Sequence, residues 1–403
     1  MKFAALVPLI VFAAIAQFPD TFLGSVSVGQ NPMDVCLSPD GNRAYAAVEF
    51  GFATAIDING YSDFSLAGLV TIDGEPVTLQ CDPTGEYLYV ADQENNLVHI
   101  INTSELSVVK TLDIQPDPTD MVLCSAGNMI YLSHENGMIT VIDTESQTVE
   151  ESFWVGEEIN SICITPAQDL VFAADDGSPE EAVITTSTGV LTHINSGMDS
   201  YGCAVSGNGT RLFLSCPSWN IIGVMDIASL TVEGTIPCTG DAPEKMAALP
   251  GLPYLYGVCP EQNTITVFGT DDLTQKGEIP LTGGPANIAA HPDGERLFIV
   301  CTADNKMKII GFDPTGIDPI MHEHMLSVLH SPSTAPSVAV TCLNGGIVSL
   351  SAFDLAGRTV WTAETVMTQN ETRQFSLENA PVGVLIVTST IEGTVNSVKV
   401  VVL

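Results

Sequence analysis

Seven copies of a unit about 42 residues long account for most of the 403-residue chain. Each copy opens on a short strand-like run followed by a tight turn, as in EPVTLQCDPTGEYLYVAD from Glu75 and GPANIAAHPDGERLFIVC from Gly284. The second residues of the copies are 44, 42, 41, 41, 43 and 42 residues apart, and they are Pro32, Pro76, Pro118, Ile159, Ser200, Pro243 and Pro285. A period of about 40–45 residues with several short strands per copy is typical of propeller blades. The repeat therefore predicts an all-β, seven-bladed β-propeller.

The second copy shows how one blade is built. Strands are expected at residues 77–81, 87–91, 97–101 and 107–114, because these runs are rich in β-branched and aromatic residues. The first two are joined by Asp-Pro-Thr-Gly, a sequence typical of a hairpin turn. A single four-stranded blade cannot bury both of its faces, so the copies must stack around a common axis.

The ring must also be closed, and the two ends of the repeat region indicate how. The seventh copy has three expected strands, whereas an additional strand-like run, residues 21–28, precedes the first copy. We expect residues 21–28 to complete the seventh blade, because an unpaired sheet edge would otherwise invite aggregation.

The repeat resembles a known family. Residues 138–144, 88–92 and 292–298 are similar to the YVTN-type propeller repeat. The resemblance covers roughly residues 21–320 and implies a seven-bladed extracytoplasmic propeller, whose domain is expected to span residues 17–320. Copies four and five depart from it, since Ile159 and Ser200 stand where the other copies have proline.

The repeat ends before the tail, residues 337–403, which a linker at residues 321–336 joins to the propeller. Residues 353–360, 381–387 and 398–402 resemble the C-terminal sorting domain of type IX secretion cargo. That resemblance implies a small C-terminal β-sandwich, which the export machinery would recognise. Val384 stands where that domain usually has an aromatic residue.

The first 16 residues have the pattern of a signal peptide. Lys2 precedes an apolar run, and Ala-Ile-Ala at residues 14–16 is a typical cleavage site. No later run is long and apolar enough for a spanning helix, so no membrane span is expected after signal removal. The sequence therefore predicts a secreted or cell-surface protein.

The charge of the chain narrows the class of partner. Lysine and arginine number 12 against 48 aspartate and glutamate residues, for a formal net charge of -36. Such a surface repels phosphate backbones, so nucleic acid is excluded as a partner. Cations and basic proteins are favoured.

Ten cysteines in an exported chain raise the question of disulfides. Cys216, Cys259 and Cys301 occupy equivalent positions in three successive copies, and packed sheets lie about 10 Å apart, too far for a bridge. Most of the thiols are therefore interpreted as buried apolar groups, and their pairing is left open.

Propellers commonly bind ligands at the axial mouth, where loops of all blades converge. Two columns of polar residues are expected there, one at the starts of the innermost strands and one at the ends of the second strands. The candidate ligand-binding residues in them are Asp34, Thr78, Asp92, Asp120, His134, Ser161, Asp175, Lys245 and Asn287.

Three interpretations of this acidic mouth remain open. Its carboxylates could hold calcium, which prefers six to eight oxygen ligands. His134 and the cysteine column could hold a softer metal. The residues could also be solvated or structural polar groups. No cofactor is assigned beyond the calcium hypothesis, and no catalytic residue is assigned.

The favoured function is a non-enzymatic, exported binding module whose axial face takes a protein, a glycan or a cation. Two alternatives are kept: a propeller enzyme such as a lactonase-like hydrolase, and a structural cell-surface protein. No Gly-x-Ser-x-Gly or P-loop motif stands in the sequence to favour the enzyme.

Overall fold

The computed structural model of the protein describes residues 18–312 in full and, in the tail, the backbone of seven strands. The predicted signal peptide, residues 1–16, lies outside the described residues. The same holds for the predicted linker, residues 321–336, apart from strand β29 (His324–Leu329).

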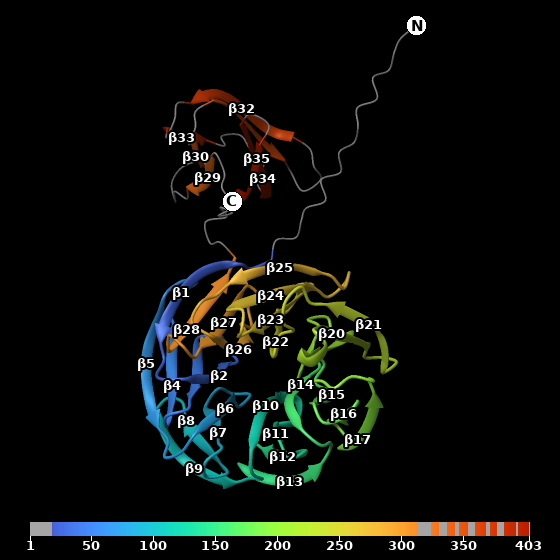
Figure 1. The fold of residues 1–403 in the computed structure, drawn as a ribbon. Coiled ribbons are helices and arrows are strands. Elements are labelled where there is room, and N and C mark those ends of the chain that lie inside the picture. The colour runs from blue at the N-terminus through green and yellow to red at the C-terminus, as the bar shows by residue number, and fades with distance from the viewer. Residues whose placement is uncertain are drawn as a thin grey trace.

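Seven four-stranded antiparallel sheets follow one another around a central axis (Figure 1). Within each blade the strands run from the axis outward in chain order, and only the seventh blade takes its outer strand from elsewhere in the chain. Blades 1 to 3 are formed by β2 (Pro32–Leu37), β3 (Arg43–Val48), β4 (Phe52–Ile58) and β5 (Phe64–Thr71); β6 (Pro76–Cys81), β7 (Tyr87–Asp92), β8 (Leu97–Asn102) and β9 (Ser107–Asp113); and β10 (Pro118–Cys124), β11 (Met129–His134), β12 (Met138–Asp143) and β13 (Thr148–Trp154). Blades 4 to 7 are formed by β14 (Ile159–Ile164), β15 (Leu170–Asp175), β16 (Glu180–Thr185) and β17 (Val190–Asn195); β18 (Gly202–Val205), β19 (Arg211–Cys216), β20 (Ile221–Asp226) and β21 (Thr231–Pro237); β22 (Lys245–Ala248), β23 (Tyr254–Cys259), β24 (Thr264–Gly269) and β25 (Gln275–Pro280); and β26 (Pro285–Ala290), β27 (Arg296–Cys301), β28 (Lys306–Gly311) and β1 (Thr21–Ser27). The predicted all-β, seven-bladed propeller is confirmed.

The turns that join the first two strands of a blade need a residue whose backbone adopts the left-handed conformation, with positive φ. Gly41, Gly85 and Gly294 supply it, with φ angles of 70°, 73° and 73°. Glycine adopts this region at no steric cost, so the turn sequences visible in the repeat correspond to real hairpin turns.

The hydrophobic core is divided among the junctions between blades. Each pair of neighbouring blades encloses its own cluster of buried side chains. Tyr45 of blade 1 packs with Leu79 and Val90 of blade 2, for example, and Phe298 of blade 7 packs with Ile56 of blade 1. No blade holds a core of its own, so stability depends on the completed ring.

Strand β1 closes the ring, as the sequence predicts. It pairs antiparallel with β28, with Thr21 opposite Gly311 and Ser27 opposite Lys306, and a bulge lies between Phe22 and Gly24. The first and last strands of the repeat region thus share one sheet (Figure 1).

Polar side-chain contacts also stabilise the junction between blades 7 and 1. The guanidinium of Arg296 lies 5.3 Å from the ring centroid of Tyr61 and bonds the Asp293 carboxylate through Nε at 2.9 Å. The hydroxyl of Tyr61 donates to the carbonyl of Phe312 at 3.1 Å and accepts from its N–H at 3.0 Å. Blade 1 is therefore tied to the end of blade 7 by side chains as well as by β1.

The tail strands form two sheets. One has the order β29–β30–β33, with β30 (Ser337–Cys342) and β33 (Glu371–Ser376). The other has the order β32–β31–β34–β35, with bounds Thr359–Met367, Gly346–Phe353, Gly383–Ile391 and Thr394–Val402. Whether the sheets pack as the predicted β-sandwich depends on side chains that lie outside the described residues.

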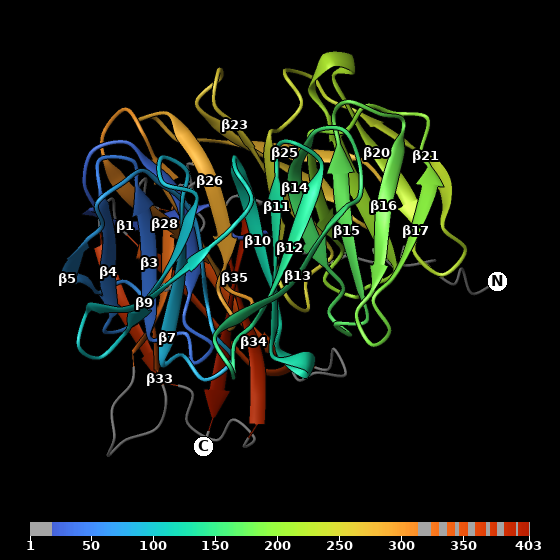
Figure 2. The ribbon, with the colours of Figure 1, turned by 90° about the horizontal axis from the view of Figure 1, so that it is seen from below.

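The strands of the propeller run between two faces that carry the loops (Figure 2). Because neighbouring strands are antiparallel, the starts of the innermost strands and the ends of the second strands lie at the same face. We call this the entry face. In the described part of the chain, no helix is long and apolar enough to cross a membrane.

Candidate functional site

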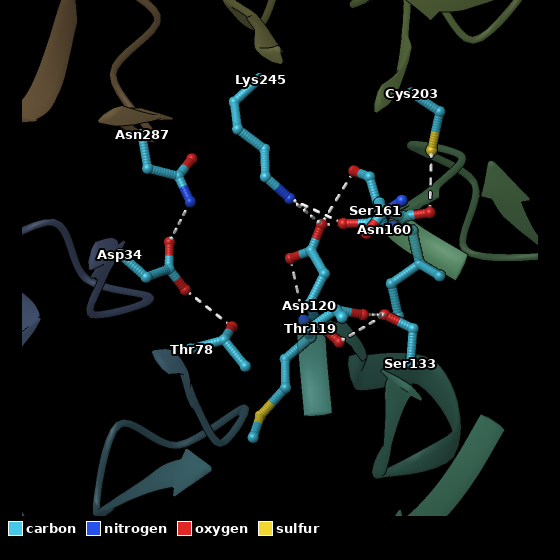
Figure 3. Close-up of polar contacts among 12 residues, drawn as sticks. Asp34, Thr78, Thr119, Asp120, Ser133, Asn160, Ser161, Cys203, Lys245 and Asn287 are labelled. Carbon is cyan, nitrogen blue, oxygen red and sulfur yellow. Dashed lines mark hydrogen bonds and ion pairs between the residues drawn. The ribbon is translucent and has the colours of Figure 1, made fainter. Parts of the chain in front are cut away.

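The innermost strands surround a central cavity of about 240 Å³. Polar side chains from the strand starts line it toward the entry face, namely Asp34, Asp120, Ser161, Lys245 and Asn287. We call these five residues the axial ring. They come from blades 1, 3, 4, 6 and 7, and Figure 3 shows several of them directed toward one another.

Asp34 is the most completely held member of the axial ring. Its Oδ1 accepts hydrogen bonds from the Asn287 amide and the Val35 N–H, both at 2.7 Å. Its Oδ2 accepts from the Thr78 hydroxyl at 2.7 Å and from the Leu79 N–H at 3.0 Å. Four donors from three blades therefore fix this carboxylate, which is only 8% exposed. Figure 3 shows the bonds from Thr78 and Asn287.

Asp120 and Lys245 form an ion pair across the axis. The Lys245 ammonium lies 3.4 Å from Oδ2 of Asp120 and donates to the backbone carbonyl of Asn160 at 2.9 Å (Figure 3). The same carboxylate oxygen accepts from the Ser161 hydroxyl at 2.8 Å and from the Ile162 N–H at 3.2 Å. Blades 3, 4 and 6 thus meet at one charged contact.

The electrostatics of the axial ring follow from burial and from this pairing. Burial, together with the nearby charge of Asp120, raises the pKa of Asp34 to about 6. The hydrogen bonds to its carboxylate lower the pKa but do not outweigh burial. Burial alone would lower the pKa of Lys245, but the charges of Asp120, Tyr201 and Asp34 outweigh it and raise that pKa. Lys245 is therefore positively charged and neutralises Asp120, while Asp34 keeps the net negative charge of the ring.

The candidate residues at the ends of the second strands, Asp92, His134 and Asp175, do not line the cavity. Asp92 is an example. This residue ends β7 and is fully buried. Its Oδ1 accepts from the Glu75 N–H at 2.9 Å, and its Oδ2 contacts the Asn95 amide at 2.9 Å and His99 Nε2 at 3.1 Å. Burial opposes ionisation, yet these hydrogen bonds lower the pKa of Asp92. The Asp92 carboxylate therefore fixes the loop that leads into blade 2.

Asp175 has the same role in blade 4. It ends β15, is 1% exposed, and accepts from the N–H groups of Glu157 and Glu158 at 2.8 and 3.0 Å. Those two residues belong to the loop that arrives from blade 3.

His134 occupies the equivalent position at the end of β11. Nδ1 contacts the Pro116 carbonyl at 3.1 Å and therefore donates, which leaves Nε2 to accept from the Thr140 hydroxyl at 2.8 Å. Burial lowers the pKa of His134 to about 4, so the ring is neutral at physiological pH. Both nitrogens are already bonded within the blade.

Metal ligands do not gather in the described residues: there, no group of three or more histidine, cysteine, aspartate or glutamate side chains lies close enough to hold a metal ion. The calcium hypothesis stays a prediction.

Some groups of the site could not be predicted directly from the sequence. The carbonyl of Asn160 that receives Lys245 is a backbone group, which no sequence pattern reveals. The deeper wall of the cavity is apolar and includes Val122, Ile164 and Ala247. These residues follow the axial ring along the same strands, so their positions can be deduced once the ring is known.

We expect Lys245→Met to destabilise the propeller by about 1–3 kcal/mol, because it leaves the largely buried Asp120 carboxylate without its cation. Both side chains are 18% exposed. Lys276→Met is the matched control, since its ion pair with Asp272 is far more exposed and should matter little. Urea denaturation of the two variants measures the difference, and equal losses would contradict a structural role for the axial pair.

The fold defines the class of protein: this is a seven-bladed β-propeller. No family model matches the chain, and no curated protein matches it. Among solved structures, hydrazine synthase from Kuenenia stuttgartiensis is similar, with a TM-score of 0.62 and 18% identity over 70% of this chain and 95% of that chain. At that identity the likeness shows the fold alone.

Proposed function

We propose that this protein is an exported binding module that takes a cationic group of a protein partner into its axial cavity. The supporting observation is the charge balance of the axial ring. Lys245 pairs with Asp120, whereas no lysine or arginine within residues 18–312 forms an ion pair with Asp34. A lysine or arginine side chain entering from the entry face would supply that missing charge.

The surroundings of the ring favour the same class of ligand. The pKa of Glu75, on the entry face, is raised by burial and then by the negative charges of Glu49 and Glu94. Mutual repulsion of carboxylates at this face is relieved when a cation arrives. The net charge of -36 adds long-range attraction for a basic partner.

The export part of the proposal comes from the sequence. Residues 1–16 have the pattern of a signal peptide, the repeat resembles the YVTN type, and residues 337–403 resemble a type IX sorting domain. In this proposal the leader is removed on export, and the tail is recognised by the export machinery.

One observation favours a second candidate, a lactonase-like hydrolase. Asp34 has a pKa of about 6, so it could take up and release a proton near neutral pH, as a general base must. The same variant tests both candidates, because Asp34 would be essential to either.

We expect Asp34→Asn to weaken binding of an arginine- and lysine-rich peptide at least tenfold, as titration calorimetry would measure. Asp63→Asn removes one charge from an exposed turn and is the matched control, expected to change affinity little. Wild-type affinity should rise from pH 5 to pH 7 as Asp34 ionises. Equal affinities for both variants would contradict the binding proposal, and Asp34-dependent turnover of a lactone probe would favour the hydrolase.

A further inference from the structure

Two cysteines of neighbouring blades face each other inside the ring. Cys36 lies on β2 and Cys81 ends β6, and their Sγ atoms are 3.9 Å apart. Both are buried, at 6% and 0% exposure, within the cluster between blades 1 and 2. They do not occupy equivalent positions in the repeat, so the spacing of equivalent residues does not apply to them.

The geometry near the axis brings the strands of this pair close together. Blades converge toward the axis, and β2 and β6 contain Cα pairs within 8 Å of each other. A disulfide needs an S–S distance of about 2.05 Å and Cα atoms within about 7 Å. The two Sγ atoms, now 3.9 Å apart, must therefore approach by about 2 Å for the bond to form.

We infer that Cys36 and Cys81 form an inter-blade disulfide when the chain folds in the presence of a disulfide oxidant. The inference is independent of the proposed ligand, because neither sulfur lines the cavity. The bridge would join the strand that carries Asp34 to the strand that carries Thr78 and Leu79, the two donors of blade 2 that hold the Asp34 carboxylate.

The chemistry is thiol–disulfide exchange. One cysteine thiolate attacks the disulfide of the oxidant, forms a mixed disulfide and releases one thiol; the second cysteine thiolate then attacks the cysteine sulfur of the mixed disulfide and displaces the second thiol. Two electrons pass to the oxidant, which leaves as two thiols carrying the two cysteine protons. In the folded ring, burial raises the pKa of Cys36 and excludes the oxidant. The exchange therefore occurs before blades 1 and 2 pack together.

The test uses the full chain, unfolded in denaturant with reductant and refolded with oxidised and reduced glutathione. Free thiols are then alkylated, and the protein is digested without reduction. We expect mass spectrometry to find the peptides of Cys36 and Cys81 linked. Recovery of both as alkylated thiols from folded protein, or linkage of either one to another cysteine, would overturn the inference.

Thermal melting gives a second measurement. The bridge closes a loop of about 45 residues, so the oxidised protein should melt about 5 °C higher than the same protein treated with dithiothreitol. Cys36→Ala should abolish this redox-dependent shift. Cys301→Ala, which removes another buried thiol, is the matched control and should retain it. A shift that persists in Cys36→Ala also counts against the inference.

Discussion

Replacing Thr21–Ser27 by seven glycine and serine residues is expected to abolish folding to a stable monomer. These seven residues are the outer strand of blade 7, and their pairing with β28 joins the two ends of the repeat region. Without them β28 becomes an exposed edge, and the hydrogen-bonded pairing that closes the ring is lost. Since every core cluster is shared by two blades, weakening one seam exposes side chains on both sides of it.

The matched control replaces β17, Val190–Asn195, in the same way. It is also an outer strand, but blade 4 remains linked to its neighbours by its three inner strands and by the chain itself. Gel filtration and thermal melting should therefore show a folded, less stable monomer for the control. For the β1 variant they should show aggregate, or a melting temperature lowered by more than about 10 °C. Equal behaviour of the two variants would contradict the closing role of β1.

The fold could be predicted from the sequence because its signals are local and repeated. A strand expected at residues 97–101 is β8, Leu97–Asn102, and the expected closing run at residues 21–28 is β1, Thr21–Ser27. A single copy would not have sufficed, since turn residues and apolar alternation occur in many β-proteins. Seven copies at one period indicate a β-propeller, because that architecture buries the faces of all seven sheets.

The site was only partly predictable, because the sequence assigns a residue to a face and a strand but does not show which loop covers its side chain. Asp34 and Asp92 both lie at strand ends on the entry face. Asp34 is on the innermost strand and lines the cavity, whereas Asp92 is on the second strand and is covered by the incoming loop that bonds to it. The pairing of Lys245 with Asp120 was equally hidden, since 125 residues separate them.

The cysteines show a related limit. In this structure the nine described cysteines are free thiols, and all of them except Cys238 are buried, in keeping with their interpretation as apolar core groups. A disulfide between blades is excluded only where the two sheets lie about 10 Å apart. Blades diverge from the axis, so that spacing is smallest at the innermost strands, where Cys36 and Cys81 lie.

Glu181→Gln is expected to stabilise the protein at neutral and alkaline pH. Glu181 lies on β16 and is fully buried. Burial raises its pKa from 4.5 to about 8, although the hydroxyls of Ser200 and Ser196 and the N–H of Asp175 donate to the carboxylate. Folding therefore favours the protonated side chain.

The sign of the pH dependence follows from this raised pKa. Between about pH 4.5 and 8 the folded state holds a proton on Glu181 that the unfolded chain has lost, so stability falls as pH rises through this window. The full effect is about 5 kcal/mol at most. His134, with its lowered pKa, acts in the opposite direction at acid pH. The difference between wild type and variant isolates the contribution of Glu181.

A glutamine fits the same contacts. Its carbonyl oxygen can accept from Asp175 and Ser200, and its amide can donate to the Ser196 hydroxyl. Glu180→Gln is the matched control, because Glu180 is the preceding residue on the same strand and is exposed. Denaturation of all three proteins from pH 5 to 8.5 should show the gain of Glu181→Gln growing with pH and Glu180→Gln following wild type. If Glu181→Gln runs parallel to wild type at every pH, the buried carboxyl is not the protonated group that its surroundings imply.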